Sequence, residues 1–158
     1  MAGTTHPPGP MGAVSLGAAQ EAIAKVTAEA VKRRVGVVVA IAAASGDLVA
    51  LARMDGVPPL AAESASRKCR TVAMTWRSTE SFAASLRGDL ETEPEYFHGM
   101  HHVGPLMTVG GGVPIVVNGH LAGVAAVSGA STADDIALAE LAARTASKGL
   151  TTRSGKGR

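Results

Sequence analysis

The feature that most constrains this chain is a glycine-rich stretch, residues 110–129, which predicts two short strands joined by a tight turn. The Asn118-Gly119 pair at its centre favours a type I′ turn, because that turn needs a positive φ at both central residues. Small residues dominate the second strand, namely Ala122, Gly123, Ala125 and Ala126. A helix or a neighbouring subunit is therefore expected to pack closely against it.

The spacing of apolar residues predicts the other elements. A helix capped by Ser15 should run to about Arg34, because apolar residues recur there at spacings of three and four. Strands are predicted over 37–43, 48–54, 115–118 and 121–127. Helices are predicted over 60–76 and 80–86, followed by an irregular segment over 87–106. A last helix should run to about Lys148, with Gly149 as the C′ residue after it. Hairpins combined with helices predict an α+β class with an antiparallel sheet.

Composition predicts one folded domain over residues 15–149. The chain has 158 residues, of which 46% are hydrophobic and 18% charged, so it is not a disordered chain. Residues 1–14 are expected to form a flexible leader and residues 150–158 a flexible basic tail. Because the apolar residues are mostly Ala and Val and aromatic residues make up only 3%, each residue buries little area. We therefore expect a homo-oligomer, in which subunit interfaces supplement the core.

Charge, hydropathy and cysteine content indicate which classes of partner and which cellular compartment to expect. The formal net charge is +2, and four of the fifteen basic residues lie in the last eleven positions, which is typical of a solvated end. A nucleic-acid footprint needs a basic patch on the folded body with stacking aromatic residues, so no nucleic-acid partner is expected. No apolar run approaches the roughly 18 residues that span a bilayer, so no membrane partner is expected. Cys69 is the only cysteine, which excludes an intrachain disulfide. With no signal peptide visible in the sequence, these observations favour a cytoplasmic protein.

Residues 98–102 form the segment with the most reactive side chains, His98, His101 and His102. Neutral imidazole binds iron, zinc, copper and nickel, and it transfers protons near neutral pH. The segment therefore offers all three histidines as metal ligands, and His98 and His101 also as catalytic acids or bases. The simpler alternative is a loop whose histidines bond to the backbone.

A second group of residues is suited to an anionic ligand. Lys68 and Thr71 lie three apart on one predicted helix face, where an ammonium and a hydroxyl could hold a carboxylate, a haem propionate or an enolate oxygen. The backbone N–H groups of Gly111 and Gly112 could bind the same kind of group. Tyr96 could stack on a flat ligand. The alternatives are a solvated lysine and packing roles for the others.

Two sequence blocks resemble the GlcG/HbpS-like haem-binding family. The first is Arg53-Met54-Asp55-Gly56 followed by Lys68 and Thr71, and the second is Gly111-Gly112-Val113-Pro114-Ile115 followed by Gly119, Gly123, Val127-Ser128-Gly129, Asp135 and Ala139. The resemblance covers roughly residues 15–146. It implies a profilin-like antiparallel sheet flanked by helices in three α/β/α layers, with oligomers from dimer to octamer. It also implies that Asp55 lies near Lys68 at a ligand site, within one subunit or across an interface.

Two functions from different classes remain open. The first is a binding protein that holds haem, the candidate cofactor, or another small anionic ligand. The second is a cofactor-free or metal-dependent lyase or isomerase acting on a small carbonyl acid. In that enzyme His98 or His101 would move protons, and Lys68 or the glycine turn would hold the oxyanion. Either site is expected where residues 95–105, the glycines at 110–112 and the helix carrying Lys68 converge.

Overall fold

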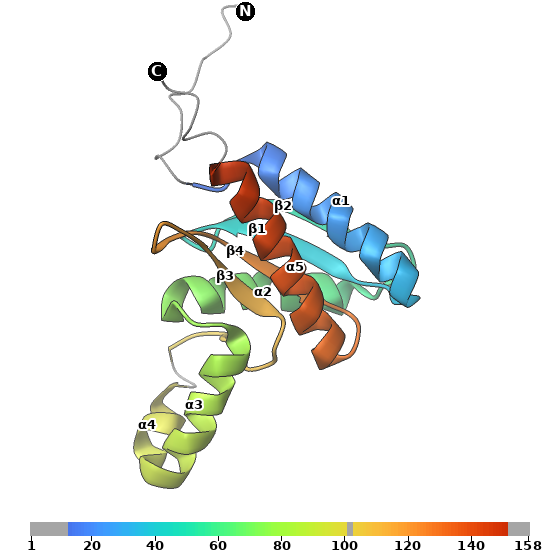
Figure 1. The fold of residues 1–158 in the computed structure, drawn as a ribbon. Coiled ribbons are helices and arrows are strands. Elements are labelled where there is room, and N and C mark those ends of the chain that lie inside the picture. The colour runs from blue at the N-terminus through green and yellow to red at the C-terminus, as the bar shows by residue number, and fades with distance from the viewer. Residues whose placement is uncertain (1–12, 101–102, 152–158) are drawn as a thin grey trace, which may run out of the picture.

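The computed structural model describes residues 13–100 and 103–151 and shows one antiparallel sheet flanked by helices (Figure 1). The elements in order are α1 (Leu16–Arg33), β1 (Val38–Ala43), β2 (Leu48–Arg53), α2 (Pro59–Thr75), α3 (Thr79–Thr92), α4 (Pro94–Met100), β3 (Gly112–Val117), β4 (His120–Ser128) and α5 (Thr132–Thr151). The strands lie in the order β2-β1-β4-β3. The predicted α+β class and all four predicted strands are confirmed.

The sheet lies between two helical layers, as expected for three α/β/α layers. Helices α1 and α5 pack side by side on one face (Figure 1), where they enclose core residues such as Val39, Ile41 and Val127. Helix α2 covers the other face, over Val38 and Ala40. Alternate residues of β1 therefore face opposite layers, and both sides of this central strand are buried.

Local signals fix the ends of several elements. The Ser15 hydroxyl accepts a hydrogen bond of 3.2 Å from the N–H of Ala18 and caps α1. The turn between β3 and β4 has φ of 51° at Asn118 and 77° at Gly119, so both central residues are left-handed as predicted. The small residues of β4 also serve close packing, since a Cβ on Gly123 would lie 2.8 Å from the side chain of Val14.

The prediction of an irregular segment over 87–106 is wrong as far as Met100, whereas residues 103–106 contain neither helix nor strand, as predicted. Helix α3 continues to Thr92, and α4 follows after a single residue. The apolar stripe indeed continues, because Leu90 follows Leu86 by four residues, and the exposed Gly88 lowers helix propensity without ending the helix. The expected role of Gly149 as the C′ residue after the last helix is also wrong, since α5 includes Gly149 and runs on to Thr151.

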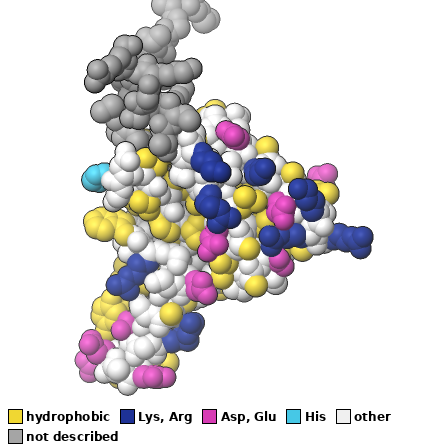
Figure 2. Space-filling model, viewed as in Figure 1, with side chains coloured by type: hydrophobic (Ala, Val, Ile, Leu, Met, Phe, Trp, Pro, Cys, Tyr) yellow, Lys and Arg dark blue, Asp and Glu magenta, His cyan; other side chains and the backbone are white. Residues whose placement is uncertain are grey.

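Helices α3 and α4 form a hairpin that extends away from the sheet (Figure 1); we call residues 79–100 the α3–α4 hairpin. Its buried side chains belong to the first half of α3, at Thr79, Phe82, Ala83 and Leu86. No described side chain between residues 87 and 109 is buried. Acidic side chains gather at the far end of the hairpin (Figure 2), which carries the exposed Glu91, Glu93 and Glu95.

Candidate functional site

The glycine stretch before β3 is closely packed. Gly111 has φ of +112°, and a Cβ there would lie 2.7 Å from the carbonyl oxygen of Val127 and 2.9 Å from Nζ of Lys68. Only glycine fits this conformation in this space. The N–H of Gly112 donates a 3.0 Å hydrogen bond to Oγ1 of Thr79. Both glycines are buried, so in this structure they are part of the framework rather than a surface that faces solvent.

Lys68 forms a buried ion pair beneath these glycines. Its side chain is 1% exposed, and Nζ donates to the carbonyl of Val127 at 2.8 Å and to Oδ2 of Asp135 at 3.3 Å. The other carboxylate oxygen accepts from the N–H of Ala130 at 3.0 Å. Burial lowers the pKa of Lys68 and raises the pKa of Asp135, and in each case the partner's charge opposes the shift. The pair thus ties α2 to the end of β4 and the start of α5.

Thr71 holds the segment that leads into the glycine stretch. Its hydroxyl donates to the carbonyl of Arg67 at 2.9 Å and accepts from the N–H of Met107 at 2.8 Å. The side chain is fully buried. The structure therefore brings together Lys68, Thr71, Gly111 and Gly112. They are enclosed, and the side chains of Lys68 and Thr71 and the N–H of Gly112 already bond to other protein groups.

Asp55 lies at the same end of the sheet but on the opposite edge. It is exposed in the turn after β2, and Gly56 has φ of +77° there. Strands β1 and β4 lie between β2 and β3. With strands about 4.8 Å apart, roughly 14 Å separates the Asp55 edge from Gly111. Nζ of Lys68 bonds to Val127 of β4, two strands from β2, and among the described residues no hydrogen bond or ion pair joins Asp55 to Lys68.

Tyr96 and His98 lie on α4, which packs against α3. Both side chains are exposed, Tyr96 by 52%. His101 and His102 lie outside the described residues. Within residues 13–100 and 103–151, no group of three His, Cys, Asp or Glu side chains could hold a metal ion. The exposed His98 and the buried Lys68 set therefore lie on different elements, α4 and α2.

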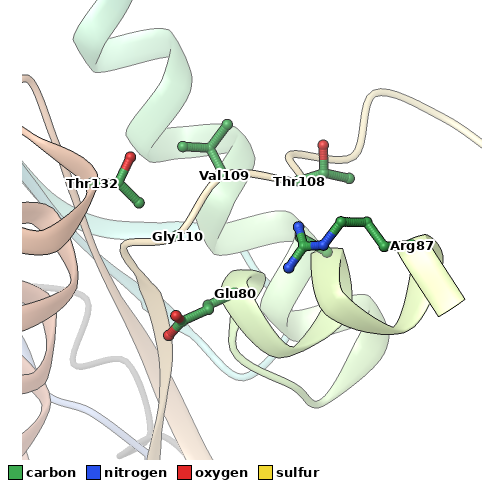
Figure 3. A pocket seen from close by; sticks show the side chains of 7 residues that line it. Glu80, Arg87, Thr108, Val109, Gly110 and Thr132 are labelled. Atoms are coloured by element: carbon green, nitrogen blue, oxygen red, sulfur yellow. The ribbon is translucent and has the colours of Figure 1, made fainter.

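A pocket of about 250 Å³ lies between α3, the segment before β3 and the start of α5 (Figure 3). Its lining residues are Glu80, Ala83, Arg87, Thr108, Val109, Gly110 and Thr132. In Figure 3 the Arg87 guanidinium is directed towards the segment that carries Gly110, and Glu80 points away from Arg87.

The sequence analysis did not identify this pocket. The spacing of Glu80 and Arg87, seven residues apart, was an available signal, because it places both on one helix face. Thr108 and Thr132 come from two other segments, so no spacing in the sequence joins them to α3.

No helix within residues 13–100 and 103–151 is long and apolar enough to cross a bilayer.

Comparison with known proteins identifies the family. The family model described as "Haem degrading protein HbpS-like" matches residues 14–144. Protein GlcG of Escherichia coli K12 is 35% identical over 101 residues, which are 63% of this chain and 69% of GlcG. The crystal structure of a PduOC–haem complex has a TM-score of 0.71 and 26% identity, over 84% of this chain and 94% of that one. A double mutant of Streptomyces reticuli HbpS shares the fold, with a TM-score of 0.72 and 24% identity over 91% and 96% of the two chains. The chain therefore belongs to the HbpS-like family.

Proposed function

We propose that this protein binds haem on the surface of the α3–α4 hairpin, with a histidine of residues 98–102 as iron ligand. The observation that carries the proposal is the likeness to the PduOC–haem complex, which extends over 84% of the chain. The name of the matching family points the same way. His98 is the described candidate, and His101 and His102 are the candidates outside the described residues.

The donor chemistry of the hairpin fits haem. Imidazole is a ligand of haem iron, and the exposed side chains of Leu90, Tyr96 and Val103 offer apolar contact to a porphyrin face. Arg77, exposed just before α3, is suited to a propionate. Bound haem supplies redox chemistry and ligand binding at its iron, whereas the protein supplies the axial ligand and the surroundings.

Cavity sizes indicate how haem would be covered. Pockets for drug-sized ligands have about 300–1,000 Å³, and the pocket beside Arg87 has about 250 Å³. A larger hollow of about 460 Å³ is lined only by Glu93, Pro94, Glu95 and Tyr96, whose carboxylates repel propionates. Neither of these two hollows is an enclosed porphyrin slot. A second copy of the chain would cover the other face of the haem.

We propose accordingly that the protein is a cytoplasmic homo-oligomer, from dimer to octamer. Large apolar side chains remain exposed on several elements, among them Trp76 by 79%, Leu60 by 77% and Val31 by 65%. Burial of such groups between subunits would supplement the alanine-rich core. Light scattering at micromolar concentration should give a multiple of the 15.8 kDa chain mass, and a mass of one chain would refute the oligomer.

The lyase or isomerase alternative has weaker support. It requires donors that can reach a developing oxyanion. Lys68 instead donates to Val127 and Asp135, and the N–H of Gly112 donates to Thr79. No observation of the described residues favours this second function.

Titration with haemin tests the proposed function. The wild-type protein should develop a saturable Soret band, and His98→Ala, His101→Ala or His102→Ala should shift or weaken it. His120→Ala is the matched control, because His120 is also exposed but lies at the β3–β4 turn, at the opposite end of β3 from the glycine stretch. A Soret band that the wild-type protein leaves the same as that of free haemin, or equal spectra of all four variants, would contradict the proposal.

A further inference from the structure

We infer that the pocket between α3, the segment before β3 and the start of α5 is a separate site for a small carboxylate that carries a hydrogen-bond donor at its other end. None of its lining residues is among the proposed haem contacts, and it does not depend on haem binding. Three features support it: polar groups without partners, complementary charges at its two ends, and walls held by the buried framework.

The polar side chains around the pocket are all available to a ligand. Within the described residues, Glu80, Arg87, Thr108 and Thr132 make no side-chain hydrogen bond or ion pair. Every other threonine with a described side chain does make one; these are Thr27, Thr71, Thr75, Thr79, Thr92 and Thr145. The two unbonded threonine hydroxyls, of Thr108 and Thr132, thus border the same pocket, although these residues are 24 positions apart in the sequence.

The charges define what the pocket would bind. A guanidinium forms paired hydrogen bonds with a carboxylate, so Arg87 specifies the anionic end of the ligand. Glu80 lies two turns earlier on α3, about 10 Å along the helix axis, and it points away from Arg87 (Figure 3). A carboxylate there accepts from an ammonium or hydroxyl group, and Thr108 and Thr132 can bond between the two ends. The volume of about 250 Å³ restricts the ligand to less than drug size.

The buried framework fixes both walls of the pocket. Thr79 begins α3 and accepts the N–H of Gly112, while Asp135 lies in the first turn of α5 and pairs with Lys68. Gly110 packs closely against the start of α5, because a Cβ at this position would lie 2.7 Å from Cδ1 of Ile136 and 3.2 Å from Cγ2 of Thr132. Hydrogen bonds and close packing therefore hold the start of α3, Gly110 and the start of α5 in place before a ligand arrives, which lowers the entropic cost of binding.

A matched series of probes tests the site. The ¹⁵N-labelled full chain, without haemin, is titrated with γ-aminobutyrate, butyrate and butylamine while the amide signals of Gly110 and Thr132 are followed. We expect saturable shifts with γ-aminobutyrate, and about tenfold weaker binding of butyrate, which lacks the donor for Glu80. Butylamine, which lacks the carboxylate, should bind more weakly still.

Substitutions separate the two ends of the site. Arg87→Gln should abolish binding of both carboxylates, whereas Glu80→Gln should remove only the preference for γ-aminobutyrate over butyrate. Arg70→Gln is the control, since Arg70 is an exposed arginine of α2 outside the pocket. The inference is overturned if no probe gives a saturable shift at these amides, or if Arg87→Gln binds as the wild type does. A haemin titration that fails would leave these outcomes unchanged.

Discussion

Removing the Lys68 ammonium alone should destabilise the protein more than removing both charges of its ion pair. In Lys68→Met, the Asp135 carboxylate stays 4% exposed and keeps only backbone donors, the N–H groups of Ala130 and Gly129. Loss of one partner from a buried pair costs about 3–5 kcal/mol, because the remaining charge is buried without compensation. For a chain of this length, that loss lowers the melting temperature by about 6–20 °C.

The double variant Lys68→Met/Asp135→Asn should recover much of this loss. The amide oxygen of Asn can still accept from the N–H of Ala130, and no charge remains buried. What is lost is the Lys68 donor to the carbonyl of Val127, which costs about 1–3 kcal/mol. The two single losses should therefore not add, with a coupling energy well above about 0.5 kcal/mol.

Urea unfolding measures these losses of unfolding free energy, provided that the m-value stays constant. It is applied to the wild type, both single variants and the double variant. A Lys68→Met variant that loses less than about 1 kcal/mol would refute the uncompensated-charge argument. So would a double variant whose loss equals the sum of the single losses, because that result would mean that the two charges do not interact in the folded state.

Three further predictions concern the buried framework. Gly111→Ala should lower the free energy of unfolding clearly more than Gly119→Ala, for which a loss of about 1–2 kcal/mol is expected. Both glycines have a positive φ, but only a Cβ at Gly111 would meet a backbone carbonyl, at 2.7 Å. Equal losses in urea unfolding would contradict this. Thr79→Val should cost about 1–3 kcal/mol by the same assay, since the buried N–H of Gly112 loses its acceptor, and a neutral effect would show that the bond is replaced. Burial raises the pKa of the Cys69 thiol to about 12, so Ellman's reagent should label it only after unfolding, and fast labelling of the native protein at neutral pH would disprove its protection.

Local patterns in the sequence predicted most of the fold. The Asn118-Gly119 turn needs only the conformational preference of two residues, and the Ser15 cap needs only a hydroxyl within reach of one N–H. Helix α3 shows where local reasoning failed. The exposed Gly88 and the turn-forming residues after it favour an end of the helix, whereas the apolar spacing of Leu86 and Leu90 favours its continuation. In the structure the helix continues through Gly88 to Thr92.

The site was harder to predict because its contacts join distant segments. Lys68 and Asp135 are 67 residues apart, and lysine is rarely buried, so its 1% exposure depends on a partner that no spacing specifies. The sequence grouped Lys68 with Thr71 correctly on one helix face, yet it could not show that this face turns inward. Thr108 and Thr132 likewise meet α3 only through the packing of the glycine stretch.

The outward extension of the α3–α4 hairpin has a consequence for how the protein opens. Since no described side chain from 87 to 100 is buried, few contacts oppose a local unfolding of this part of the hairpin while the sheet stays intact. Its amides should exchange with solvent deuterium through such partial opening, whereas those of β1 and β4 require global unfolding. The hairpin and the sheet are then separate cooperative units, and a sequence change at the far end of the hairpin alters recognition with little effect on the stability of the sheet.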